Sequence, residues 1–364
     1  MSNIFARSPF IVHETGSVGD LIRVDLYIWN GTGAVPGSPV RTLSKTIPSA
    51  SVLYCDFNIS PFIREYFTLT YPNASCNYNT NGLSDSNHWC NVTVKTYING
   101  TIHATSTYKA FDGYTEYQQG YNYDHGDIHL NEGTYYYYYD PNGTLSSDDS
   151  IRVGQLQVQA GAAAYTKIKY TNLDTSATVT TNLGTSSLRT MPRIHYTYYG
   201  ANVKTEILDD ANVVLKTFYF RPIEECKYNV ITVDFLNKYG AWDRTFFFKA
   251  SRNTFEVSGT DYNLMHQQVV DYDYYLGTKR IRNINTKESI ICNTGWVDEV
   301  YINQLKQLMN SEYIYIQSSA EFGSNYIPVK LRTKQLNVQK HINDKLINYQ
   351  IEFEYAFDGI NTVQ

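Results

Sequence analysis

Residues of alternating polarity recur along this chain of 364 residues, and short turn-forming stretches separate them. In residues 22–29, Ile, Val, Leu and Ile alternate with Arg, Asp, Tyr and Trp. Residues 348–357 alternate in the same way near the C-terminus. Because successive side chains of a strand point to opposite faces, this period of two predicts strands with one buried face. We therefore expect a mainly β fold.

Turn-forming residues between such runs predict β-hairpins. Asn99 and Gly100 separate residues 92–98 from residues 101–105, and both runs favour strands. Asn and Gly tolerate the positive φ angles that a two-residue hairpin turn requires. A second strand–turn–strand series spans residues 204–220.

A chain of this length suggests about two or three domains. We predict an immunoglobulin-like β-sandwich over residues 1–112 and a second sandwich-like β module, Tyr-rich at its start, over residues 113–221. Residues 222–364 follow a different pattern, in which strands flank a single helix. We therefore expect a third β domain there.

The expected helix spans about residues 297–310. Its apolar residues recur at helical spacing: Val297, Tyr301, Leu305 and Leu308. Asp298 and Glu299 would lie in the first turn, where carboxylates interact favourably with the helix dipole.

Tyrosine dominates the aromatic composition, with 34 Tyr against 16 Phe and 4 Trp. Tyrosine suits half-buried strands and is also enriched at protein interfaces. Both interpretations remain open: a β-rich core with Tyr at its margins, or surfaces that meet other subunits. The residues we predict at an interface are Tyr135, Tyr136, Tyr137, Tyr138, Tyr139, Trp242 and Phe247.

The charge pattern argues against several classes of partner. The net charge is −5, and no basic block is present, so wrapping of nucleic acid is disfavoured. Passage of DNA through a lumen, without sequence-specific binding, is compatible with this charge. The short basic run over residues 279–282 is interpreted as a solvated strand edge or a subunit contact. No apolar run reaches the roughly 20 residues of a membrane span.

Neither a secretion signal nor a cysteine framework is expected. The first ten residues lack a basic stretch followed by an apolar run. The five cysteines form no CxxC spacing, so we expect no zinc site. Cys76 and Cys90 could pair across a loop, and the sequence alone does not decide whether they do.

Candidate catalytic residues are few. His125, Asp127 and His129 have a spacing that can bind a metal, but their Tyr- and Gly-rich context favours turn or interface roles. The carboxylate pairs at 209–210, 224–225 and 271/273 show no arrangement across a cleft. We therefore expect no enzyme activity, cofactor or metal.

The C-terminal order of strand, helix and three strands over residues 281–357 resembles the tail-tube and distal-tail proteins of tailed phages. Residues 295–299, Gly-Trp-Val-Asp-Glu, would open the helix. In that family, a β-barrel or sandwich with one flanking helix joins side by side into rings. The resemblance covers about a third of the chain and is architectural.

Four phrases resemble virion proteins of the crAss-like phages that infect Bacteroides. They lie at residues 8–12, 25–30, 58–66 and 235–242. The resemblance implies a neck or tail ring, or a tail-hub part, in a virion assembled in the bacterial cytoplasm. It also implies contact with portal, neck or tail proteins and rings of about six or twelve copies.

The alternative function is a receptor- or glycan-binding β-sandwich protein. Aromatic faces stack on sugar rings, while Asn and Asp can bond to hydroxyl groups. The chain nevertheless has only 4 Trp and lacks the repetitive shaft of many fibres.

Overall fold

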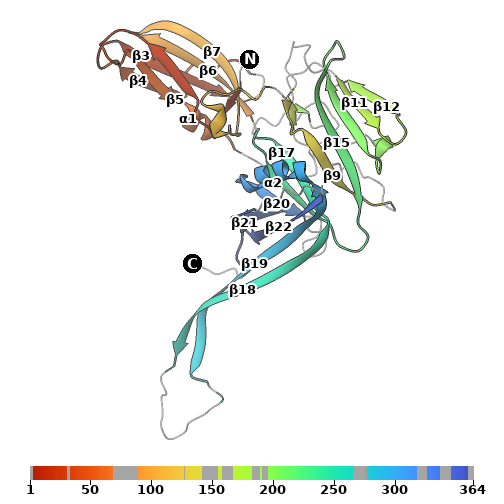
Figure 1. Ribbon diagram of the computed structural model, residues 1–364. Helices are drawn as coiled ribbons and strands as arrows, with labels where there is room; N and C mark the ends of the chain where they lie inside the picture. Colours follow the sequence, from red (N-terminus) through yellow and green to blue (C-terminus); the bar gives the residue numbers. More distant parts are fainter. Residues whose placement is uncertain are drawn as a thin grey trace. The chain divides into compact units, whose positions relative to one another are not determined.

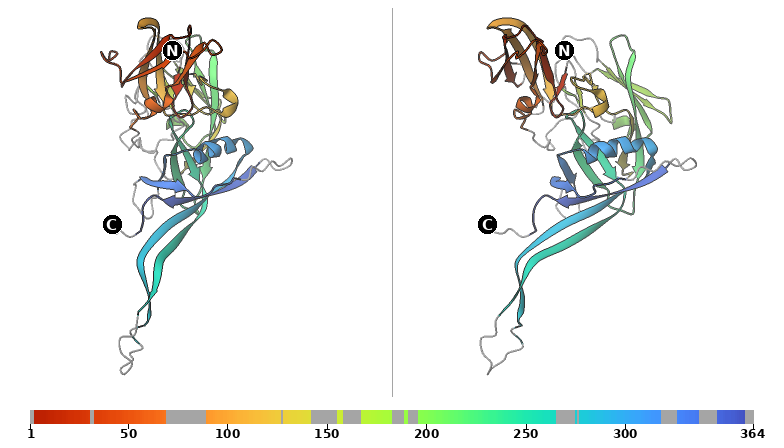
Figure 2. Two further views of the ribbon diagram at one scale, coloured as in Figure 1. Left: turned by 90° about the vertical axis from the view of Figure 1, so that its left-hand side faces the viewer. Right: turned by 60° about the vertical axis from the view of Figure 1, so that its left-hand side comes forward.

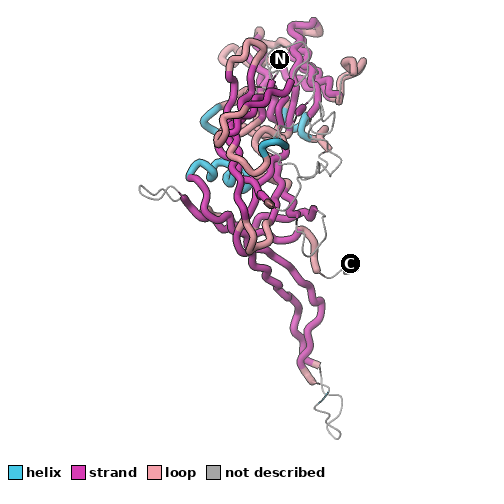
Figure 3. Tube along the Cα trace, turned by 90° about the vertical axis from the view of Figure 1, so that its right-hand side faces the viewer, coloured by secondary structure: helices cyan, strands magenta, loops and turns pink. Residues whose placement is uncertain are grey.

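The computed structural model describes residues 3–30, 33–68, 89–126, 128–141, 155–157, 167–182, 189–190, 196–264, 275, 277–317, 326–336 and 346–359. Strands dominate these residues, as the tube in Figure 3 shows, and the prediction of a mainly β fold is confirmed. Within the described part, the one helix of seven or more residues is α2 (Ile302–Met309).

The chain divides into two compact units. Unit 1 comprises Met1–Glu224, Asp234–Thr245 and Asn303–Glu312, and unit 2 comprises Glu225–Val233, Phe246–Ile302 and Tyr313–Gln364. The two predicted N-terminal modules fall together in unit 1. Unit 1 also takes two segments from the predicted third domain.

A five-stranded sheet opens unit 1 (Figure 1). Its order is β1 (Asn3–Phe5), β7 (Thr101–Phe111), β6 (Trp89–Ile98), β3 (Leu21–Trp29) and β4 (Arg41–Thr46). Asn99 and Gly100 turn β6 into β7 with φ angles of 50° and 84°, so the predicted hairpin is confirmed.

The apolar face of this sheet is covered by a small two-stranded pair and a short helix. These elements are β2 (Ile11–Thr15), β5 (Tyr54–Asn58) and α1 (Ser60–Arg64). Phe57 and Ile63 from the cover share one hydrophobic core with Ile22, Val24 and Leu26 of β3. The apolar face of β3 is buried, as its alternation predicts, although Asp25 and Tyr27 on the other face are also buried. The immunoglobulin-like character stays a prediction.

Two further sheets lie in the part of unit 1 that follows residue 112. One has the order β12 (Thr178–Asn182), β11 (Lys167–Asn172), β14 (Val203–Leu208), β15 (Val214–Glu224) and β9 (Gly133–Tyr139). The other has the order β13 (Arg189–Thr190), β10 (Gln155–Gln157) and β8 (Ile128–His129). Two 3₁₀ turns, η1 (Tyr117–Gln119) and η2 (Tyr196–Tyr198), lie in the same part.

Neighbouring strands β16 (Ile231–Leu236) and β17 (Trp242–Phe247) are joined by a turn over residues 237–241. Gly240 has a φ of +69°, and a Cβ there would lie 2.8 Å from the backbone of Asp112. A side chain would therefore both strain this turn and displace its neighbour.

In unit 2 the strand order is β20 (Ile314–Gln317), β21 (Tyr326–Leu331), β22 (Leu346–Tyr355), β19 (Lys279–Asp298) and β18 (Lys249–Asn263). Tyr349, Ile351, Phe353 and Tyr355 of β22 are buried, as their alternation predicts. Phe357 lies beyond the strand and is partly exposed.

The helix begins later than predicted. Val297 belongs to β19, a 3₁₀ turn η4 follows at Glu299–Tyr301, and α2 starts at Ile302. Val297 is nevertheless buried, as are Tyr301, Leu305 and Leu308. Helical spacing cannot distinguish a buried apolar residue just before a helix from one inside the helix. The predicted start at Val297 was therefore too early. No helix among the described residues is long and apolar enough to cross a membrane.

Candidate assembly surface

Strands β18 and β19 form a ribbon that extends past the sheet of unit 2 (Figure 1). Their pairing runs from Lys249 opposite Asn293 to Asn263 opposite Lys279. Strand β22 pairs with β19 only from Ser289 to Asp298. We call residues 255–263 and 279–288 the arm, because here two strands continue without a third. Figure 2 shows the arm leaving its sheet in both further views.

The arm has an apolar face. Phe255, Val257 and Gly259 alternate along β18 and therefore point to one side of the ribbon. A Cβ at Gly259 would collide with Ile281 Cγ2 and lie 3.6 Å from Ile284 Cγ1, so both isoleucines lie on the same side. The exposed fractions are 59% for Phe255, 60% for Val257, 52% for Ile281 and 41% for Ile284.

The opposite face of the arm is polar. Glu256 faces Lys287, and Tyr262 faces Arg280 across the ribbon. Arg332 holds the base of this face, because its guanidinium bonds Glu256 at 2.6 Å and Glu352 at 3.2 Å. The face with Phe255 and Ile281 also carries their cross-strand partners, Glu288 and Asp261. The arm is thus amphipathic: one face is polar and tied to the sheet, and the other keeps four apolar side chains half-exposed.

The arm also has backbone edges that no further strand covers. β18 ends the strand order of its sheet, and β19 has no second neighbour along residues 279–288 among the described strands, although Thr286 O accepts a bond from Gly359 N at 2.9 Å. Unpaired N–H and C=O groups along a long edge are a template for pairing with another chain. The arm therefore offers both an apolar face and hydrogen-bonding edges.

The tyrosine run over residues 135–139 forms β9 and pairs in parallel with β15. Tyr135, Tyr136 and Tyr137 are buried inside the chain, whereas Tyr138 and Tyr139 are half-buried. The Tyr137 hydroxyl donates to Ala201 O at 3.1 Å and accepts from Gly200 N at 2.9 Å. Three of the five predicted interface tyrosines are therefore core residues here, and the other two keep some surface.

Trp242 and Phe247, also predicted at an interface, are almost fully buried in strand β17. Phe247 packs edge-to-face on Phe353 of β22, with ring centroids 5.9 Å apart. Because both large side chains pack inside the chain, they leave little surface for a partner.

His125 and His129, the two described histidines whose spacing could suit a metal, lie in an aromatic cluster. His125 Nε2 lies 3.1 Å from Tyr114 O, and His129 Nε2 lies 3.0 Å from Gly126 O. The His129 ring stacks on Tyr239 at 5.7 Å. Burial lowers the pKa of His125. Asp127 lies outside the described residues, and no metal-binding cluster occurs within the described ranges.

The carboxylate pairs have local structural roles. Asp209 accepts a bond from Val213 N at 2.7 Å in the turn between β14 and β15. Glu225 is buried and bonds Lys249 Nζ at 2.6 Å. Asp271 and Asp273 lie outside the described residues. Cys90, which could have paired with Cys76, is a buried free thiol.

A buried polar network in unit 1 centres on Asp243. Asp243 accepts bonds from Asn131 Nδ2 at 3.0 Å, Gln304 Nε2 at 3.3 Å and the Arg244 backbone N at 2.9 Å. Burial raises the pKa of Asp243 to about 7. Beside it, the Arg244 guanidinium bonds both carboxylate oxygens of Asp234, at 2.6 and 2.8 Å.

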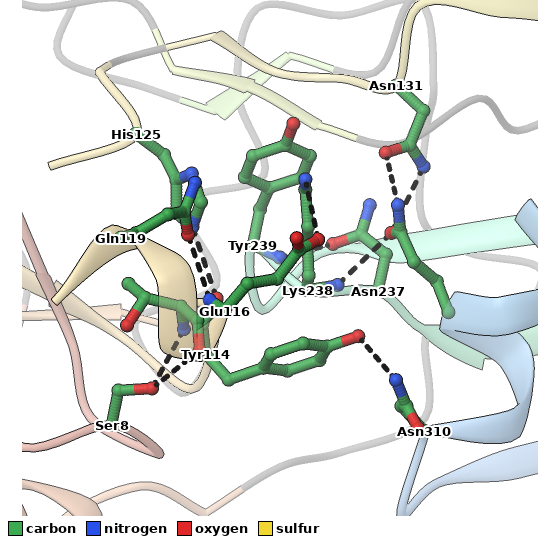
Figure 4. Close-up of polar contacts among 12 residues, drawn as sticks. Ser8, Tyr114, Glu116, Gln119, His125, Asn131, Asn237, Lys238, Tyr239 and Asn310 are labelled. Carbon is green, nitrogen blue, oxygen red and sulfur yellow. Dashed lines mark hydrogen bonds and ion pairs between the residues drawn. The ribbon is translucent and has the colours of Figure 1, made fainter. Parts of the chain in front are cut away.

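This network explains why unit 1 contains three separate segments. Asn131 also exchanges two bonds with Gln307 of α2, and Figure 4 shows these bonds close to Lys238 and Asn237. Polar groups of Asn131 and of the segments 234–245 and 303–312 thereby form hydrogen bonds with one another away from water. The arrangement has the character of a structural junction, since most of its polar groups bond one another, although the buried Gln304 Oε1 has no hydrogen-bond partner among the described residues.

The sequence interpretation missed strand β18 and the arm. Phe255 and Val257 alternate with Thr254, Glu256 and Ser258, so a period-two signal was present. The basic run at residues 279–282 does lie on an exposed strand, as one of its two interpretations expects.

Comparison of the chain with protein-family models, with curated proteins and with solved structures finds no match.

Proposed function

We propose that this chain is a structural subunit that assembles with copies of itself into a ring in the neck or tail of a tailed phage particle. The observation that carries the proposal is the amphipathic arm of unit 2. Its exposed apolar face and free edges suit a surface that another subunit covers. The proposal assigns the chain no reaction.

Energetics support this use of the arm. A two-stranded ribbon is marginally stable in water unless another surface packs on it. Burying one large apolar side chain contributes about 1.5–3 kcal/mol, so the half-exposed set of four can still contribute roughly 4 kcal/mol per arm. In a closed ring this contribution recurs at every subunit.

The order of elements also supports the proposal. β19, α2, β20, β21 and β22 follow one another as the strand–helix–three-strand series on which the tail-tube resemblance rests. In a ring each interface is heterologous, so the arm of one copy would meet a different surface on the next. Portal, neck or tail proteins would then adjoin the ring in the virion, and phage DNA would pass through its lumen.

Mass measurement of the purified full chain, together with negative-stain images, tests this function. We expect closed rings of about six or twelve copies. A chain that stays single at tens of micromolar would contradict the proposal.

A further inference from the structure

A second exposed feature lies in unit 1, on the loop over residues 113–126, which we call the tyrosine loop. Its side chains fasten it to the first strands of the chain. Asn122 exchanges two bonds with the backbone of Ile11, at 2.6 and 2.7 Å. Asp124 accepts from both the backbone and the side chain of Asn3, at 3.0 and 3.1 Å.

Further bonds fix the loop from within. Glu116 and Gln119 cap the η1 turn reciprocally. His125 bonds Tyr114 O, and the Tyr114 hydroxyl accepts from Asn310 Nδ2 at 3.3 Å (Figure 4). The loop is therefore held on both sides of the η1 turn, and the turn itself is capped, which lowers the entropy cost of binding.

This well-fastened loop presents aromatic rings to water. The exposed fractions are 100% for Tyr117, 73% for Tyr121 and 41% for Tyr123. A fully exposed ring adds nothing to the core. At about 150–250 Å² for each aromatic side chain, the three rings offer roughly 400 Å². The three rings fall short of the roughly 800 Å² that each partner contributes to a stable protein interface, and, unlike the arm, the loop contains no strand whose edge a second chain could pair with. The area therefore fits a small ligand better.

The charge of the loop narrows the ligand class. Residues 113–126 contain no Lys or Arg, which disfavours phosphate groups and polyanions. The two carboxylates are already engaged, since Glu116 lies 3.8 Å from Lys238 Nζ and Asp124 bonds Asn3. Phenol rings with hydroxyl tips match a ligand that has apolar faces and hydroxyl groups. We propose that the tyrosine loop binds a neutral saccharide, independently of assembly through the arm.

Electrophoresis of the full-length protein in native gels tests this proposal. The gels contain a soluble neutral glucan, mannan, xylan or galactan, or the acidic polymer polygalacturonate. We expect at least one neutral polymer to retard the wild type. The double variant Tyr117→Ala/Tyr121→Ala should bind at least tenfold more weakly, because it removes two rings on which a sugar would stack. A tenfold loss of affinity corresponds to only about 1.4 kcal/mol. Tyr275→Ala, at an exposed tyrosine of unit 2, is the matched control and should bind like the wild type.

A positioning variant separates rigidity from contact. Asn122→Ala keeps all three tyrosines but releases the loop from Ile11, so we expect severalfold weaker retardation. Absence of retardation in all four neutral polymers, retardation by polygalacturonate alone, or equal binding by the double variant would overturn the proposal. A change in particle mass in the double variant would also overturn it, because the loop would then be a subunit contact.

Discussion

Replacement of Asp243 by Asn should remove a specific pH dependence of stability. An exposed Asp has a pKa of 3.8, whereas burial raises the pKa of folded Asp243 to about 7. Between these values the folded chain holds a proton that the unfolded chain has released. Stability therefore falls as the pH rises from about 4 to 7.

The size of the effect follows from the same two values. At about 1.4 kcal/mol per pKa unit, the shift from 3.8 to about 7 corresponds to about 4 kcal/mol. This is the cost of burying the charged carboxylate above pH 7, where Asn131 and Gln304 bond it through neutral amide groups. The amide of the Asp243→Asn variant cannot titrate, so the variant should lack this loss.

Urea unfolding followed by tryptophan fluorescence at pH 4 and pH 8 measures the effect. From pH 4 to pH 8, the free energy of unfolding of the wild type should fall by about 4 kcal/mol more than that of Asp243→Asn. Asp210→Asn, at an exposed turn residue, controls for the loss of one negative charge and should follow the wild type. Parallel pH curves for wild type and Asp243→Asn would refute the reasoning.

Two further variants test the packing of unit 1. In a thermal unfolding assay, Gly240→Ala should destabilise the chain by at least about 2 kcal/mol, because φ is positive and a Cβ would approach the Asp112 backbone. The control Gly100→Ala, at a glycine with positive φ but open space around it, should cost only about 1 kcal/mol. Asp234→Asn should cost about 3–5 kcal/mol, because it leaves buried Arg244 without its carboxylate partner; a loss below about 1 kcal/mol on urea unfolding would show that the pair is not buried as described.

Local patterns predict much of this fold. The alternation in β3 and β22 identifies their buried faces, and Asn99-Gly100 identifies a hairpin, because these features depend on neighbouring residues only. The spacing from Tyr301 to Leu308 likewise identifies the buried face of α2.

Features that depend on distant residues were not predictable. The arm exists because the pairing of β22 with β19 ends at Ser289, while β18 and β19 continue to Asn263 and Lys279. Nothing near Phe255 in the sequence reveals where a strand about a hundred residues later stops. The tyrosine run shows the same limit. Its five consecutive rings suggested an interface, but in the structure the run pairs in parallel with β15 and three of the rings are buried.

Sedimentation velocity of the full chain tests the central claim most directly. The wild type should sediment as a multi-copy particle, and Phe255→Ser/Val257→Ser, which makes the apolar face of the arm polar, should sediment as a single chain. Ile102→Ser, at a similarly exposed residue of β7, should behave like the wild type. A single-chain wild type, or an arm variant that assembles normally, would contradict the account.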